Sequence, residues 1–300
     1  METGPADPAD PATAIRTEGL RKVYRRGQDD LVALEGLDLT VGKGEFFGLL
    51  GTNGAGKSTT IGMLTTLVTP TAGSAWVAGH EVGADPVGVK SRIGVVPQTD
   101  TLDRALTVLD NLAFRGRYFG LPAQAARRRA LELLERFGLA AEAGARTSQL
   151  SGGQARRVMI GRALMHLPEV LFLDEPTAGV DPRARADLWR IIGDLHAAGQ
   201  TVVLTTHHLD EAEALCRRLA VIDHGRLLAC DTPEAIKASS GAQTVITVRY
   251  DADARPVEEA VRRAPAARTT SPSRARPYGC APRAPTACSV TCCAKEAPRA

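Results

Sequence analysis

The sequence predicts an α/β protein with a mainly parallel core sheet, because short apolar runs alternate along the chain with segments of helical period. Leu188, Ile191, Ile192 and Leu195 recur at the spacing of one helix face. Runs typical of buried strands occupy residues 45–50, 170–173, 201–205 and 219–222. Strands that are joined by helices pair in parallel, so we expect helices on both faces of this sheet.

The same pattern divides the 300-residue chain into three regions. Residues 1–14 are acidic and rich in Pro, and we expect a disordered leader that lacks the apolar core of a secretory signal. Residues 15–250 are expected to form one domain, with a helical insertion at about 100–165. Residues 251–300 contain 13 Ala and 7 Pro but no Leu, Ile or Phe, so we expect a disordered tail. A shifted reading frame in a GC-rich gene would produce the same composition, a hypothesis that resequencing the gene would test.

Charge and hydropathy argue against two classes of function. The net charge is +3, but residues 251–300 hold 9 basic and 5 acidic residues, which leaves 28 basic and 29 acidic residues in the rest. A near-neutral globular region gives no electrostatic argument for nucleic acid, and we expect no nucleic-acid partner. The sequence contains no run of 18 apolar residues, so we expect no membrane span and a cytoplasmic protein.

A glycine-rich segment between the first of these strands and the following helix has the pattern G-x-x-x-x-G-K-[ST]. Glycines let the backbone turn its N–H groups toward phosphate oxygens, and the start of the helix adds positive charge. Lys57 can reach the β- and γ-phosphates, and the Ser58 hydroxyl can bind Mg²⁺. The predicted nucleotide-binding residues are Gly51, Thr52, Asn53, Gly54, Ala55, Gly56, Lys57, Ser58 and Thr59.

Two adjacent acidic residues, Asp174 and Glu175, follow the apolar run at 170–173. We expect this strand to lie beside the strand of the glycine-rich loop, which would bring both carboxylates to the nucleotide. Asp174 is then suited to hold Mg²⁺, and Glu175 to orient or deprotonate the attacking water. The alternative interpretation is two solvated turn residues before Pro176, which the phosphate loop upstream disfavours.

A third motif, Leu150-Ser-Gly-Gly-Gln154, precedes a predicted helix from Ala155 to about His166. Ser151 can cap that helix, and the two glycines allow backbone N–H groups to approach an anion. Because this motif lies between the phosphate loop and Asp174, the chain resembles the ATP-binding cassette (ABC) ATPases over about residues 15–250. The resemblance implies a P-loop NTPase that binds ATP, with an antiparallel β subdomain and a helical subdomain that carries the signature motif.

The resemblance also implies roles for residues outside these motifs. Tyr24 matches the aromatic residue that stacks on adenine, although a tyrosine at a strand end would also suit this position. Gln98 matches a glutamine that contacts Mg²⁺ or the water, which adds it to Ser58 and Asp174 as a metal-binding residue. His207, which follows two threonines, matches the switch histidine that contacts the γ-phosphate. The expected catalytic residues are Lys57, Gln98, Glu175 and His207.

Members of this family work in pairs beside a membrane protein, which implies two partners for this chain. A second copy would close head to tail on the first, so that the signature of one chain covers the γ-phosphate held by the other. The residues expected to act across this homodimer are Ser151, Gly153 and Gln154. Segments 178–189 and 205–213 resemble those of antibiotic-resistance exporter ATPases of the daunorubicin type. That likeness implies a separate ABC permease and a place on the inner face of the cell membrane.

Two other functions stay open from the sequence. A soluble ABC ATPase that acts on ribosomes or DNA would usually carry two cassettes or a long coiled coil, and the sequence has neither. A regulatory subunit with impaired hydrolysis is the second alternative, since the tail departs from the family pattern. The sequence names no cargo, although drugs, antibiotics or lipid-like molecules would fit the resemblance.

Overall fold

The computed structural model describes residues 11–26, 29–239, 244–250, 267–270 and 288–294. The chain divides into two units, Met1–Ile236 and Lys237–Ala300. The sequence predicts the domain boundary after residue 250, whereas the structure places it between residues 236 and 237. The physical reason is that the strand at 244–250 pairs with a strand nearer the C-terminus, within the second unit.

The core of the first unit is a six-stranded sheet in the order β10-β9-β3-β8-β7-β6. Its strands pair in parallel from β9 to β6, and β10 pairs antiparallel with β9 at one edge. The predicted α/β fold with a mainly parallel sheet is therefore confirmed. The strands are β3 (Phe46–Leu50), β6 (Ile93–Val96), β7 (Val170–Asp174), β8 (Thr201–Thr206), β9 (Arg218–Asp223) and β10 (Arg226–Asp231).

One predicted neighbour in this sheet is wrong. The sequence predicts β7 beside β3, but β8 lies between them and pairs with both. Thr205 of β8 is opposite Leu49 on one side and Asp174 on the other. All three strands are apolar and mostly buried, so their residue patterns do not determine which two are adjacent. As a result, β8 contributes side chains between the phosphate loop and the carboxylates.

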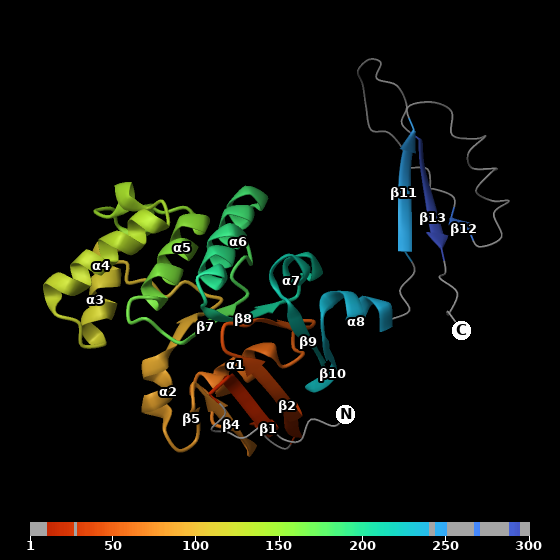
Figure 1. Ribbon diagram of the computed structural model, residues 1–300, viewed down its shortest axis with the longest axis horizontal. Helices are drawn as coiled ribbons and strands as arrows, with labels where there is room; N and C mark the ends of the chain where they lie inside the picture. Colours follow the sequence, from red (N-terminus) through yellow and green to blue (C-terminus); the bar gives the residue numbers. More distant parts are fainter. Residues whose placement is uncertain (1–10, 27–28, 240–243, 251–266, 271–287, 295–300) are drawn as a thin grey trace. The chain divides into compact units, whose positions relative to one another are not determined.

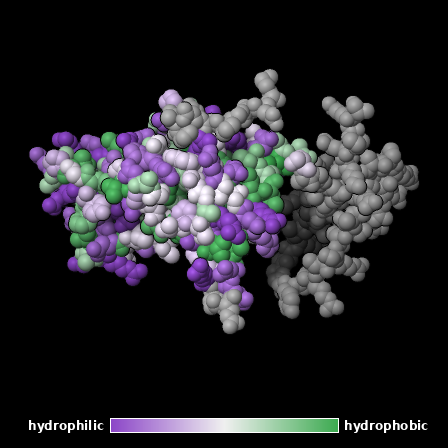
Figure 2. Space-filling model, turned by 90° about the horizontal axis from the view of Figure 1, so that it is seen from below, coloured by the Kyte–Doolittle hydropathy of each residue, from purple (hydrophilic) through white to green (hydrophobic). Residues whose placement is uncertain are grey.

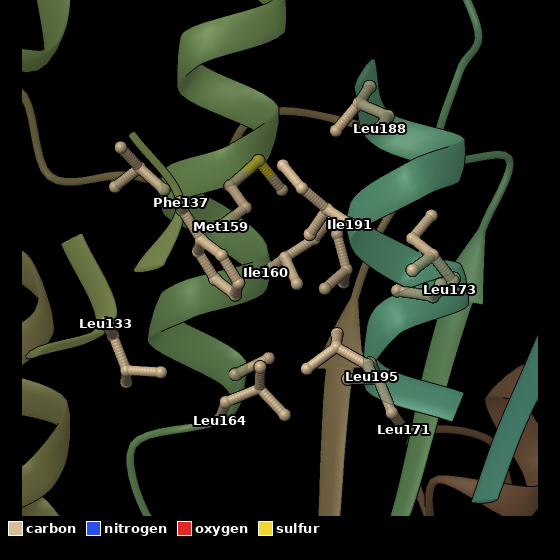
Figure 3. Packing of buried hydrophobic residues seen from close by; sticks show 14 of the residues in the cluster. Leu133, Phe137, Met159, Ile160, Leu164, Leu171, Leu173, Leu188, Ile191 and Leu195 are labelled. Atoms are coloured by element: carbon tan, nitrogen blue, oxygen red, sulfur yellow. The ribbon is translucent and has the colours of Figure 1, made fainter. Parts of the chain in front are cut away.

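The helices pack on both faces of the core sheet. Leu171 and Leu173 belong to a buried cluster with Ile160 and Ile191, whereas Phe172 belongs to a second cluster on the other face. This alternation is the period of two that a strand imposes on its side chains. Figure 3 shows the first cluster filling the space between α5, α6 and the sheet. The helices are α1 (Lys57–Leu64), α2 (Pro86–Arg92), α3 (Val108–Tyr118), α4 (Ala123–Arg136), α5 (Gly152–Ala163), α6 (Pro182–Ala197), α7 (Leu209–Leu215) and α8 (Pro233–Ser239).

The predicted helical insertion at about 100–165 is present as α3, α4 and α5, with two short 3₁₀ turns at Ala140–Glu142 and Thr147–Gln149. These three helices gather above the core sheet in Figure 1, on the opposite side from β1, β2 and β4. They contact one another, with α3 against α4 as the most extensive helix pair. The insertion is therefore a helical subdomain that ends in the signature helix α5.

A second sheet of the first unit is antiparallel, in the order β2-β1-β4-β5, as the resemblance implies. A buried cluster that contains Leu20 and Leu34 from this sheet and Phe47 from β3 joins it to the core sheet. The strands are β1 (Thr13–Arg26), β2 (Asp29–Gly42), β4 (Ala72–Val77) and β5 (His80–Glu81).

The disordered leader predicted for residues 1–14 is too long. Strand β1 starts at Thr13, and Ala14 is buried. The Ala14 carbonyl accepts a hydrogen bond from the Ala78 N–H at 2.8 Å, a tertiary contact that composition alone does not reveal. Residues 1–10 of the predicted leader lie outside the described part of the chain.

The second unit contains a three-stranded antiparallel sheet in the order β11-β13-β12. Two of its strands lie in residues 251–300, so the prediction of disorder is wrong for these segments. The prediction averaged composition over fifty residues, whereas the Val, Thr and Cys residues of β13 favour a strand locally. The rest of 251–300 lies outside the described residues. The strands are β11 (Thr244–Tyr250), β12 (Ala267–Thr270) and β13 (Cys288–Ala294).

Within the described residues, no helix is both long enough and apolar enough to cross a membrane. Hydrophilic and hydrophobic residues are intermixed on the face of the molecule shown in Figure 2.

Candidate nucleotide site

The phosphate loop connects the end of β3 to the start of α1, as the motif predicts. Gly56 has a φ of +110°, and a Cβ there would lie 2.5 Å from the Ala33 carbonyl oxygen. A Cβ on Gly51 would lie 2.2 Å from the Ile222 carbonyl oxygen. Only glycine fits these two positions, because the loop passes directly over neighbouring backbone. In the described part of the chain no side chain caps α1, so the helix start keeps its positive end for a ligand.

Lys57 extends back along the inside of this loop. Its side chain is buried, with Nζ donating to the carbonyl oxygens of Gly51 at 2.9 Å and Thr52 at 3.1 Å. The same Nζ lies 3.5 Å from the Glu175 Oε1 atom. Thr52 and Asn53 are exposed on the loop, Ala55 is buried beneath it, and Thr59 is partly buried on α1. The loop therefore holds one desolvated positive charge beside the predicted general base.

Glu175 is the point where the predicted catalytic residues meet. Gln98 Nε2 donates to Glu175 Oε2 at 3.2 Å, and His207 Nδ1 lies 3.2 Å from the same oxygen. The Glu175 side chain is only 9% exposed. Lys57, Gln98 and His207 come from three separate segments of the chain, so this convergence is a property of the fold. His208, the neighbouring histidine, instead begins α7 as its N-cap residue.

The two predicted metal-binding oxygens also lie together. Ser58 Oγ donates to Asp174 Oδ1 at 3.4 Å, and Thr205 Oγ1 donates to the same oxygen at 2.5 Å. Thr205 also accepts a hydrogen bond from the Glu175 N–H, at 3.0 Å to its hydroxyl. Gln98, the third predicted metal ligand, has its hydrogen bond with Glu175 rather than with this pair. The hydroxyl and carboxylate oxygens of Ser58 and Asp174 are the hard donors that Mg²⁺ prefers.

A pocket of about 700 Å³ opens over the phosphate loop. Tyr24 lies on its wall, at the end of β1 opposite Leu31 of β2. Leu31 and Val32 are 46% and 37% exposed, which provides an apolar surface beside the aromatic ring. The residues that line the pocket are Tyr24, Arg25, Leu31, Val32, Ala33, Asn53, Gly54, Gly56, Lys57, Ser58, Thr59, Gln98 and Glu175.

The signature motif is placed differently from the other predicted site residues. Ser151 caps α5 by accepting from the Gln154 N–H at 3.2 Å, and the Gln154 side chain accepts from the Ser151 N–H at 2.9 Å. Gly153 is buried, and a Cβ there would lie 2.8 Å from the Ala184 Cβ of α6. This segment lines a separate pocket of about 410 Å³, which shares only Gln98 with the pocket over the phosphate loop.

Three residues at the site escape the sequence analysis: Arg156, Thr205 and Glu211. Arg156 belongs to a buried face of α5 that residues 153, 156, 160 and 163 form at helical spacing. A charged residue on such a face is the signal that could identify it. Thr205 could be identified as a site residue only by knowing that β8 lies between β3 and β7, and the sequence does not reveal that strand order. Nothing in the sequence distinguishes Glu211 as a buried residue, since its neighbours Asp210 and Glu213 are also acidic.

Comparison with known proteins shows which family this chain resembles. Residues 34–178 match the ABC transporter family. The daunorubicin/doxorubicin resistance ATP-binding protein DrrA of Streptomyces peucetius is 46% identical over 245 residues, which cover 82% of this chain and 73% of that protein. The Nod factor export ATP-binding protein I of Paraburkholderia xenovorans is 44% identical over 238 residues, 79% of this chain and 77% of that protein.

A solved structure shows the same fold. It is a dimeric ATP-binding cassette in a post-hydrolysis state with ADP and Pi bound, and it aligns with a TM-score of 0.68 at 28% identity. The alignment covers 73% of this chain and 98% of that one. With a shared fold, a matching family model and relatives that are similar over most of their length, this chain belongs to the ABC transporter family, as an ATP-binding and ATP-hydrolysing cassette.

Proposed function

We propose that this chain is the ATP-hydrolysing subunit of a membrane exporter, and that it works as a head-to-tail pair on a separate permease. The observation that carries the proposal is the position of the Glu175 carboxylate, between Lys57, Gln98 and His207 beside the pocket over the phosphate loop. Export is supported by the relatives, which are named for daunorubicin resistance and for Nod factor export. A drug, an antibiotic or a lipid-like molecule is the proposed cargo.

In the proposed reaction, Glu175 takes a proton from water as the water oxygen attacks the γ-phosphorus in line with the bridging oxygen. The bond to that oxygen breaks, ADP leaves, and inorganic phosphate forms. Lys57 and the loop N–H groups neutralise the charge on the phosphates, which is where most of the rate enhancement arises. Gln98 and His207 contact Glu175 Oε2 and are placed to orient the carboxylate and the water.

We propose Mg²⁺ as the metal, held by Ser58 and Asp174 with Gln98 nearby. Within the described residues, no group of three or more His, Cys, Asp or Glu could hold a metal ion. A site with one hydroxyl and one carboxylate fits an ion that also binds phosphate oxygens and water. When bound, the ion would neutralise charge on the β- and γ-phosphates.

The head-to-tail pair accounts for the two separate pockets. Leu150 and Gly152 of the signature motif line the pocket that lies apart from the phosphate loop, and no residue of the motif lines the pocket that contains Lys57, so one chain does not bring its own signature to its own Lys57. A second copy could supply the signature across an interface, and the similar cassette named above is a dimer. The proposed active site is therefore built from two chains.

The permease is proposed to dock on the helical subdomain, and the complex to lie on the inner face of the membrane. A pocket of about 670 Å³ on this subdomain is lined by Phe114 and Tyr118, which are 62% and 72% exposed. Arg162 in the same pocket donates to the Thr101 carbonyl oxygen at 2.6 Å. Since Thr101 is three residues from Gln98, a permease segment in this pocket would have a short route to the nucleotide site.

The test is the dependence of ATP turnover on protein concentration, measured alone and with the candidate permease in lipid vesicles. We expect turnover per chain to rise steeply with concentration and again with the permease, because a single chain holds only half of the site. Constant turnover per chain by a proven monomer would contradict the two-chain site. Co-purification with ribosomes rather than membranes would favour the soluble alternative, and no turnover under any condition would favour the regulatory one.

A further inference from the structure

The backbone of Glu175 needs support from its surroundings. Its φ is +44°, in the left-handed region that non-glycine residues rarely adopt. Such a conformation persists only when neighbouring groups hold it. The Glu175 N–H is fixed by Thr205 of β8, at 3.1 Å to the carbonyl oxygen and 3.0 Å to the hydroxyl. The following residues, Pro176 and Thr177, leave the sheet, so another part of the structure must hold them.

Arg156 holds the turn from the side of the signature helix. Its guanidinium is buried and donates to three carbonyl oxygens, those of Pro97 at 2.6 Å, Gln98 at 2.8 Å and Glu175 at 3.3 Å. The planar fork of arginine matches this arrangement, whereas the single ammonium of lysine does not. Burial lowers the pKa of Arg156, and the charges of Asp100, Asp174 and Glu211 oppose that shift. One side chain therefore fixes the backbones of both Gln98 and Glu175, whose side chains contact each other.

Glu211 holds the turn at Thr177. It is 1% exposed, and its Oε1 atom accepts from Thr177 Oγ1 at 2.8 Å and from Trp189 Nε1 at 3.0 Å. Its second oxygen, Oε2, is buried and has no hydrogen-bond partner among the residues that the structure describes. A buried carboxylate with a free oxygen is costly, so its presence calls for an explanation. Attraction to the buried Arg156 charge and the tie to Thr177 together provide one.

We propose that Arg156 and Glu211 are positioning residues that clamp the turn at residues 175–177 from two sides and so set the orientation of Glu175 for ATP hydrolysis. The clamp draws on α5, which begins within the signature motif, and on α7, which follows His207. Neither residue lines the pocket over the phosphate loop, and Arg156, which lines the pocket beside the signature, donates from its guanidinium to the carbonyl oxygens of Pro97, Gln98 and Glu175. Both residues are therefore placed to act through Glu175. The inference rests on the proposed role of Glu175 as the general base.

The experiment compares Arg156→Lys, Glu211→Gln and Thr177→Val with the native chain at saturating concentration. We expect kcat to fall about tenfold or more, since a small misplacement of a catalytic group has effects of up to about 10²-fold. The KM for ATP and the affinity for a fluorescent ATP analogue should stay within about twofold, because the nucleotide contacts are unchanged. Arg157→Lys is the matched control: Arg157 lies on the same helix but donates to the Phe137 carbonyl oxygen, and kcat should not change.

Two further measurements separate positioning from general stability. In a Glu175→Gln background, adding Glu211→Gln should cause no further loss of single-turnover rate, because residues that act as one unit are not additive. Thr177→Ser keeps the hydroxyl for Glu211 and should retain most of the kcat that Thr177→Val loses. If thermal unfolding shows that the Arg156 and Glu211 variants do not fold, the test of the clamp is the comparison of Thr177→Ser with Thr177→Val. Equal kcat values for these two variants would overturn the clamp.

The outcomes also distinguish the clamp from the proposed function. If Glu175→Gln leaves turnover intact, the general base is elsewhere and the clamp fails with it. If Glu175→Gln abolishes turnover while Arg156→Lys, Glu211→Gln and Thr177→Val keep native kcat, only the clamp fails.

Discussion

The phosphate loop and the signature motif are both glycine-containing turns that lead into a helix, yet their surroundings differ. At the phosphate loop, no side chain caps α1, and a lysine, a glutamine and a histidine all approach one carboxylate. At the signature, Ser151 and Gln154 satisfy each other in a capping box. The phosphate loop leaves the N–H groups at the start of α1 available to a ligand, whereas the signature uses its own side chains to bond N–H groups at the start of α5.

This difference is what the proposed two-chain site would require of its two halves. The loop half collects the groups that we propose for phosphate binding and proton transfer, and it is assembled from β3, β7, β8 and the segment around Gln98. The signature half is a rigid, self-capped helix start beside its own pocket. A rigid surface suits a group that must fit against a nucleotide held by another chain.

The largest effect is expected at the loop half. Glu175→Gln removes the carboxylate that would accept the proton but keeps the size of the side chain and its contact with Gln98. We expect steady-state ATP turnover to fall by at least about 100-fold, the usual range for loss of a general base. ATP binding, measured by isothermal titration calorimetry, should be retained or tightened.

The matched control for this change is Glu169→Gln, at an exposed acidic residue whose partner is Arg92. It should leave turnover unchanged, since Glu169 lies outside the pocket over the phosphate loop. If Glu175→Gln turned over ATP at the native rate, the loop half would lack its proposed base.

The second effect tests whether the halves act across two chains. Lys57→Ala should inactivate the loop half, and Ser151→Arg should block the signature half, so each variant alone is expected to be inactive. In an equal mixture, random pairing makes half of the dimers mixed, and each mixed dimer has one native composite site. We expect about a quarter of native turnover from statistics alone. Two halves acting within one chain would give no recovery.

The sequence predicts the fold to the extent that local pattern determines it. The strands at residues 45–50, 170–173, 201–205 and 219–222 and the helix through Leu188 and Leu195 all form, because hydrophobic period and turn residues act locally. The order of strands in the sheet depends on crossover connections, which leave no mark in buried strands of the same composition. That is why β8 between β3 and β7 is absent from the prediction.

The candidate site follows the same rule. Gly51, Lys57 and Ser58 are recognisable because one continuous motif builds their environment. Glu211 is not, because its function depends on contacts with Thr177 and Trp189, which are 34 and 22 residues away in the chain. Side chains that act through tertiary contacts need the structure before they can be found.

A third prediction concerns the two signature glycines, which the structure distinguishes. Gly153→Ala places a Cβ 2.8 Å from the Ala184 Cβ and should destabilise the fold by about 1–3 kcal/mol through overpacking. Gly152→Ala meets nothing within 4 Å, so it should be neutral or stabilise α5 by up to about 1 kcal/mol. Urea unfolding of the two variants measures the difference. Equal midpoints would show that α5 and α6 can shift apart, and that the signature half is less rigid than we describe.

The smallest effect is expected at the base-binding end of the loop half. Tyr24→Ala removes the aromatic ring beside Leu31, and we expect the Kd for ATP to rise about five- to tenfold, in line with about 1 kcal/mol for an aromatic contact. Tyr24→Phe keeps the ring and should bind within about twofold of the native chain. Since stacking uses the face of the base, the Kd for GTP should rise by a similar factor. An unchanged Kd for Tyr24→Ala would mean that Tyr24 is only a strand-end residue, and that Leu31 and Val32 form the base-binding surface by themselves.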